Sequence, residues 1–193
     1  MGSADFVAKL RESAPMRRRG IHRWAEGSGV ASLGEALASV PDGEWWLRLA
    51  KVFGADLAPA KLTLFAAECA ERAMPAWAAK HPRDMRPQTA LTEVRRWLYG
   101  KSNTAVMDDY IRGIREADLS VSSAQVAAGA NVSDPDLRAL TAACAAARSV
   151  HQPFDGALGA AILSADAAAD EKAEFRWQAD RLRELFPEVL VAR

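Results

Sequence analysis

Apolar residues recur along this 193-residue chain at spacings of three and four, the period of a helix that buries one face. The pattern predicts helices over 33–40 behind Ser32, over 45–53 behind Asp42 and ending at Gly54, and over 59–80 starting at Pro59. Further helices are predicted over 5–10, 87–99, 106–114, 137–150, 155–168 and 175–186. No segment shows sustained alternation of β-branched residues, so we predict an all-α fold, a single-domain multi-helix bundle.

The centre of the predicted bundle is a helical hairpin. Segments 62–80 and 87–99 are joined by a Pro-containing turn over 82–87, and we expect them to pack antiparallel against the Ala-rich segment 137–150. Pro75 lies inside the first of these helices and removes one backbone hydrogen bond, which predicts a kink or a break near residues 71–74. Serines at 120–123 predict a turn, and the segment around Arg17, Arg19 and Gly20 a basic loop.

Charged side chains are dense on this apolar hairpin. The candidate binding residues for a partner or a ligand are Glu68, Glu71, Arg72, Asp84, Arg86 and Arg95, with Trp177 added from the last long helix. Because the turn brings the end of one helix beside the start of the next, we expect all of the hairpin candidates from Glu71 onward to converge. Two interpretations stay open: a partly buried structural network, whose loss of one partner would cost roughly 3–5 kcal/mol, or a binding surface.

Composition narrows the classes of function. Basic and acidic residues number 25 each, so no overall field favours nucleic acid or a membrane surface. The basic and aromatic segment 17–24 is therefore interpreted as a solvated face. Two cysteines are too few for a secreted disulfide scaffold. Residues 1–12 lack the apolar core of a signal peptide, and no apolar run has the length of a membrane span, so we expect a cytoplasmic location. Three scattered histidines and no nucleophile–base or phosphate-loop spacing predict no metal, no cofactor and no catalysis.

The hairpin carries a motif that allows a comparison with a known family. It contains Phe65, Ala66, Cys69, Ala70, Glu71 and Arg72, then Asp84, Arg86 and Pro87, then Arg95 and Trp97. The motif resembles the immunity-protein-5-like family of bacterial polymorphic toxin systems, and the resemblance extends over roughly residues 45–187. It implies a cytoplasmic protein that binds and neutralises a cognate toxin without catalysis. Family members often carry further histidines in the Ala-rich half, where this chain has only His151.

Domain organisation and a competing function complete the predictions. Residues 1–40 are expected to form an N-terminal helical extension, and residues 41–190 an all-α immunity-like domain. The alternative function is a helical small-molecule-binding protein or enzyme, in which Glu68, Arg72 and Arg95 would orient a polar ligand in a pocket at the hairpin. Partner binding predicts an exposed charged or aromatic surface, whereas ligand binding predicts a closed cavity. Homo-oligomer formation is left open by the sequence.

Overall fold

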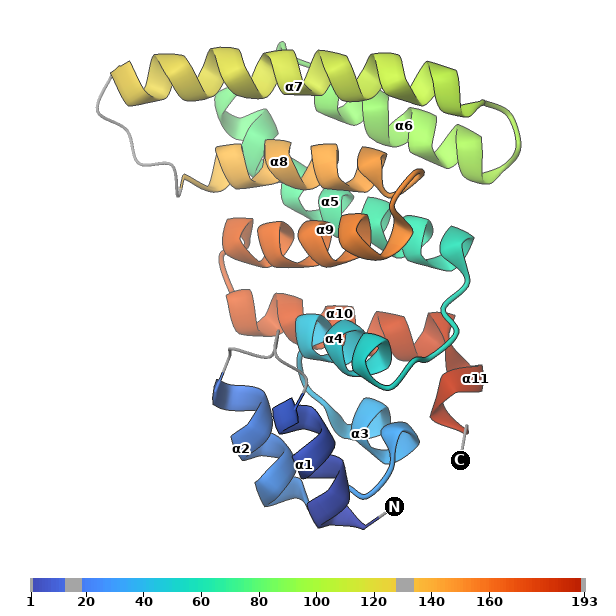
Figure 1. The fold of residues 1–193 in the computed structure, drawn as a ribbon. Helices are drawn as coiled ribbons and strands as arrows, with labels where there is room; N and C mark the ends of the chain where they lie inside the picture. Colours follow the sequence, from blue (N-terminus) through green and yellow to red (C-terminus); the bar gives the residue numbers. More distant parts are fainter. Residues whose placement is uncertain (1, 13–18, 128–133, 192–193) are drawn as a thin grey trace. The chain divides into compact units, whose positions relative to one another are not determined.

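The computed structural model describes residues 2–12, 19–127 and 134–191, and every regular element in these ranges is an α-helix, as Figure 1 shows. This confirms the all-α fold. The helices are α1 (Ser3–Glu12), α2 (Arg19–Ser28), α3 (Leu33–Ser39), α4 (Gly43–Val52), α5 (Pro59–Lys80), α6 (Arg86–Leu98), α7 (Thr104–Ala127), α8 (Pro135–Arg148), α9 (Pro153–Ala167), α10 (Glu171–Leu185) and α11 (Pro187–Leu190). Within the described ranges, none of them combines the length and the apolar character needed to cross a bilayer.

Contacts divide the chain into two compact units. One unit comprises Met1–Leu57 together with Phe175–Arg193, and the other comprises Ala58–Glu174. The boundaries of these units fall at residues 57–58 and 174–175, so α10 begins in the second unit and continues in the first. The predicted extension over 1–40 and domain over 41–190 stay predictions.

The unit Ala58–Glu174 is built around α5, which packs against α8 and α9 and is joined to α6 by a short turn. A buried stripe on α5, including Leu62, Phe65 and Trp77, faces this core. An ion pair between Glu71 on α5 and Arg95 on α6 joins residues nearly equally distant from the turn, as expected for antiparallel helices. The predicted hairpin against the Ala-rich helix is therefore confirmed.

Small residues bring α8 and α9 close together. A Cβ atom added to Gly159 would lie 3.3 Å from the Cβ of Ala145, and one added to Gly156 would lie 2.5 Å from the Cα of Ser149. Neighbouring alanines on α8, among them Ala142 and Ala146, are fully buried. The Ala-rich composition is thus used for a close helix–helix contact.

A predicted break and a predicted turn are wrong. α5 is a continuous helix with Pro75 inside it, so the break near residues 71–74 does not occur, and the alternative of a kink stays a prediction. The apolar stripe on both sides of the proline is held by α8 and α9, and Pro75 itself is exposed. α7 likewise continues through residues 120–123 instead of turning there. Serine is only a weakly unfavourable helix residue, and this stretch contains neither proline nor glycine.

The predicted basic loop is also wrong where the structure describes it. Residues 13–18, which include Arg17, lie outside the described residues, whereas Arg19 and Gly20 begin α2. A Cβ on Gly20 would lie 2.8 Å from the Cζ2 atom of Trp45, so this glycine permits a close approach between helices rather than a chain reversal.

In the unit formed by 1–57 and 175–193, the predicted helix caps are confirmed. The Ser32 hydroxyl accepts a hydrogen bond from the backbone N–H of Glu35 at 3.2 Å, and the Asp42 carboxylate accepts one from Trp45 at 3.1 Å. Trp46 is fully buried, and its ring centroid lies 5.7 Å from that of Phe186. Trp46 is therefore an anchor of the core of this unit.

Candidate functional site

The predicted charges of the hairpin lie at two separate places instead of forming one network. Glu71 and Arg95 make a two-point ion pair, with Nε–Oε1 and Nη2–Oε2 distances of 2.9 and 2.6 Å. Their side chains are 40% and 29% exposed, respectively. This pair joins α5 to α6 at the surface, so the larger cost expected for a buried charge does not apply to it.

Arg72 is directed to another element. Its Nε donates to the Oε2 atom of Glu174 at 2.8 Å, and Glu174 is buried at the start of α10. Glu68 lies half-buried one turn before Arg72. The pKa of Arg95 is raised chiefly by its hydrogen bond to Glu71, and the charge of Glu68 raises it further. These contacts occupy the residues that the ligand-binding alternative would require to orient a small molecule.

Asp84 and Arg86 form a local pair at the turn. The carboxylate accepts hydrogen bonds from the backbone N–H and the Nε of Arg86, at 3.1 and 2.9 Å. Hydrogen bonding to this guanidinium holds the pKa of Asp84 below its ordinary value. Since α5 rises about 1.5 Å per residue, this pair lies well over 10 Å along the hairpin from Glu71. The prediction that all five hairpin charges converge is wrong.

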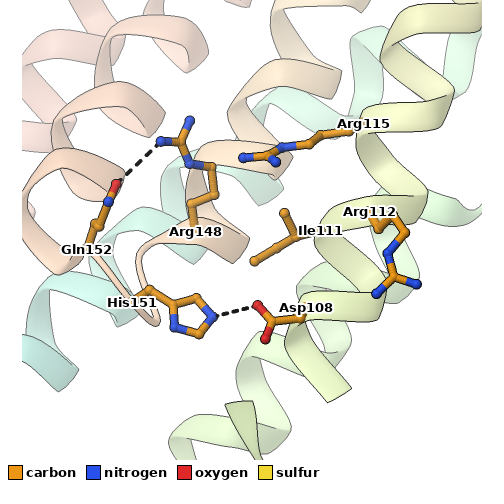
Figure 2. Close-up of a pocket in the computed structure, with 7 residues that line it drawn as sticks. All are labelled: Asp108, Ile111, Arg112, Arg115, Arg148, His151 and Gln152. Carbon is orange, nitrogen blue, oxygen red and sulfur yellow. Dashed lines mark hydrogen bonds and ion pairs between the residues drawn. The ribbon is translucent and has the colours of Figure 1, made fainter. Parts of the chain in front are cut away.

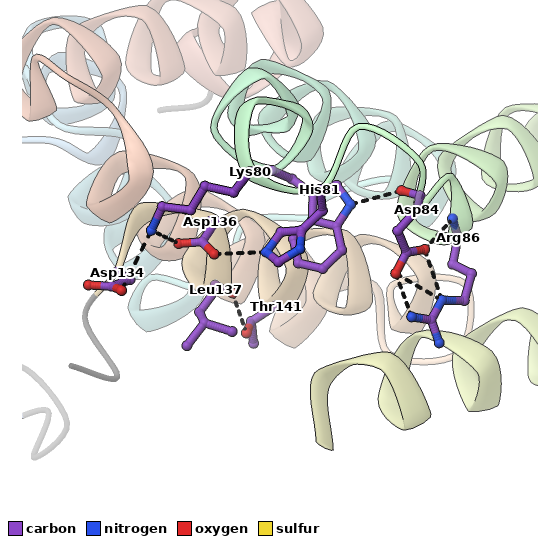
Figure 3. A network of polar contacts seen from close by, with 9 residues as sticks. Lys80, His81, Asp84, Arg86, Asp134, Asp136, Leu137 and Thr141 are labelled. Carbon is purple, nitrogen blue, oxygen red and sulfur yellow. Dashed lines mark hydrogen bonds and ion pairs between the residues drawn. The ribbon is translucent and has the colours of Figure 1, made fainter. Parts of the chain in front are cut away.

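A polar cluster that the sequence did not suggest lies beside this turn, as Figure 3 shows. Asp136 is fully buried in the first turn of α8, and its carboxylate accepts a hydrogen bond from Lys80 Nζ at 2.8 Å. The second carboxylate oxygen lies 3.0 Å from His81 Nε2. Asp134 lies 3.6 Å from the same lysine. The cluster ties the C-terminal end of α5 to the N-terminal end of α8, where a basic and an acidic charge respectively complement the helix dipoles.

An open polar hollow lies between α7 and α8. A hollow of about 380 Å³, here called the α7–α8 hollow, is lined by Asp108, Ile111, Arg112, Arg115, Arg148, His151 and Gln152. Figure 2 shows the side chain of Arg115 extending from α7 toward Arg148 on α8, whose guanidinium is turned to Gln152. The lining contains three guanidinium groups but a single carboxylate, which makes the hollow basic in a chain of zero net charge.

Existing contacts engage only part of this lining. His151 Nε2 lies 3.0 Å from Asp108 Oδ1, and Arg112 is paired at 3.0 Å with Asp109, outside the lining. Arg148 donates to the neutral Gln152 at 3.3 Å. The side chains of Arg112 and Asp108 are 68% and 59% exposed, so the hollow is an accessible surface and not a closed cavity.

A second, smaller hollow continues from it across α8. This α8–α9 hollow, of about 190 Å³, shares Arg148 and Gln152 with the first and is otherwise lined by Thr141, Cys144, Ala145, Asp155, Gly156, Gly159 and Leu163. Its glycine and alanine lining follows from the close α8–α9 packing described above. A spacing of three places Arg112 and Arg115 on one face of α7. The same spacing separates Arg148 and His151 at the end of α8. That spacing was the signal available in the sequence.

In the described part of the chain, no group of three or more His, Cys, Asp or Glu side chains is placed to hold a metal ion. Trp177, the remaining predicted candidate, lies half-buried on the part of α10 that belongs to the unit formed by 1–57 and 175–193.

The fold and the surface together define an all-α protein whose charged side chains form surface pairs and an open basic hollow. The chain belongs to the Imm-5 like putative immunity protein family, whose model matches residues 57–185. No curated protein and no solved structure matches it. The matched span includes the seven predicted candidates and both hollows, and it begins at the start of the second compact unit rather than near residue 45.

Proposed function

We propose that this protein is an immunity protein that binds a cognate toxin in the cytoplasm and neutralises it without turnover of its own. The observation that carries the proposal is the family match over residues 57–185. Binding of this kind requires an accessible surface with groups that discriminate between partners, and arginines are frequent anchors of such surfaces.

The arrangement of charges supports binding to a macromolecule over the small-molecule alternative. The hairpin charges Glu71, Arg72, Arg86 and Arg95 lie at least partly at the surface, already paired and available to the rim of an interface. Rim charges of this kind accelerate encounter and exclude wrong partners more than they add affinity. We include these four residues, with Glu68, Asp84 and Trp177, as contributors to the contact with the toxin.

The experiment is coexpression with the product of the neighbouring gene. Rescue of growth in cells producing that product, together with a stoichiometric complex that copurifies, is the expected result. Failure of both, with a purified protein that retains a small molecule or turns one over, would instead support the ligand-binding alternative.

A further inference from the structure

We propose that the α7–α8 hollow receives an acidic segment of the partner protein, with carboxylates of that segment bound by Arg115 and Arg148. This inference rests on the proposed function and names the surface and the partner chemistry. The two arginines come from helices that are adjacent in the bundle, and they line the same hollow.

Electrostatics give the first argument. Arg115 makes no ion pair with any of the described residues, and Arg148 is hydrogen-bonded to the neutral side chain of Gln152. Two guanidinium groups extending into one hollow repel each other, and a carboxylate placed between them relieves that repulsion. The planar guanidinium presents paired N–H donors that match a carboxylate in a two-point geometry.

The neighbouring groups restrict where the acidic residues of the partner would lie. Asp108 lines the α7–α8 hollow, and Asp155 lines the α8–α9 hollow. Carboxylates of the partner are therefore favoured at Arg115 and Arg148 and disfavoured beside the two aspartates. A continuous polyanion such as a nucleic-acid strand would place phosphates beside these two aspartates, whereas a protein segment can place a neutral or basic residue there.

The shape of the surface favours a segment over a single ion. The α7–α8 and α8–α9 hollows share Arg148 and Gln152, so together they form a track from α7 across α8 to α9. The first part of the track has the buried side chain of Ile111 in its lining, and the second part has Leu163 and small residues. A segment with a central acidic residue and an apolar residue beyond it matches this order of charged and apolar groups.

The test reverses the two central charges. Arg115→Glu combined with Arg148→Glu should weaken the complex with the neighbouring gene product by about 100-fold in a calorimetric titration, because two charge-assisted contacts become repulsive. The matched control is Arg23→Glu with Lys172→Glu, which makes the same change in charge at exposed helix positions outside both hollows. The control should bind like the unchanged protein, and both variants should keep its circular dichroism spectrum because all four side chains are exposed.

Each outcome decides the inference. Equal weakening by the reversal and its control, or no weakening by the reversal, would overturn the assignment of this surface while leaving an immunity function in place. A protein that forms no complex at all, even before substitution, would overturn the proposed function together with it.

A gel-shift measurement with single- and double-stranded oligonucleotides forms a further arm. Oligonucleotide binding that depends on Arg115 and Arg148, with toxin binding unchanged by the reversal, would assign the hollow to phosphates and refute the acidic-segment proposal.

Discussion

Replacement of Asp136 by Asn should measure how strongly the turn end of the hairpin is tied to α8. The carboxylate is fully buried, lies 2.8 Å from the Nζ of Lys80 and 3.0 Å from the Nε2 of His81, and the amide has nearly the same size. A hydrogen bond to a charged group contributes about 1.5–3 kcal/mol. Lys80 is 52% exposed and regains hydration when its partner is lost. We therefore expect a total loss of about 3 kcal/mol, the lower end for two such bonds.

The assay is urea denaturation followed by circular dichroism, supported by thermal melting. A loss of that size corresponds to a decrease in melting temperature of roughly 5–10 °C for a chain of this length. The matched control is Asp134→Asn, which removes a carboxylate that is 32% exposed and lies 3.6 Å from the same lysine. A surface pair of this type contributes about 0–1 kcal/mol, so the control should change little.

A pH series separates the ion pair from packing. Hydrogen bonding to Asp136 raises the pKa of Lys80 above its ordinary value of 10.5. A raised folded-state pKa contributes stability that is fully present below the unfolded value and is lost as pH rises through the folded value. The difference in stability between the unchanged protein and Asp136→Asn should therefore shrink in strongly alkaline solution. Equal losses from Asp136→Asn and Asp134→Asn, or no loss from the former, would refute the reasoning.

Two further predictions concern the hairpin. Arg95→Ala should reduce the free energy of unfolding by only about 0.2–1 kcal/mol, since its pair with Glu71 is exposed, and a melting temperature lowered by more than about 4 °C would contradict the surface assignment. Asp84, whose pKa is lowered chiefly by the hydrogen bond from Arg86, should stabilise the fold above its unfolded value near 3.8 and lose that contribution as pH falls through its folded value. Between pH 5 and about pH 2, the melting temperature should accordingly decrease less for Asp84→Asn than for the unchanged protein. Equal decreases of the two melting temperatures would contradict this.

Local signals predicted much of the fold. Ser32 and Asp42 cap their helices through their own side chains, and Gly100, with φ of 67°, ends α6 in the left-handed region as a C-terminal stop does. The same kind of rule gave a wrong loop at Gly20, and the break allowed at Pro75 is absent, because at both places the outcome depends on packing between helices. Burial of the apolar face of α5 outweighs one missing hydrogen bond, and Gly20 is placed by the ring of Trp45.

The candidate site could be predicted only in part for the same reason. Glu71 with Arg95, and Asp84 with Arg86, were expected to meet, since hairpin geometry and short sequence separation bring them together. The partner of Arg72 is Glu174, more than a hundred positions later, and no local pattern indicates it. The α7–α8 hollow depends in the same way on which helices become neighbours.

The two cysteines differ in their accessibility to a thiol-labelling reagent. Cys69 is fully buried, and desolvation followed by the charge of Glu174 raises the pKa of its thiol, so the reactive thiolate is suppressed there. Cys144 is only partly buried and lines the α8–α9 hollow beside Arg148. A maleimide dye applied to the folded protein should therefore react first at Cys144, which would place a fluorophore within the track without a substitution.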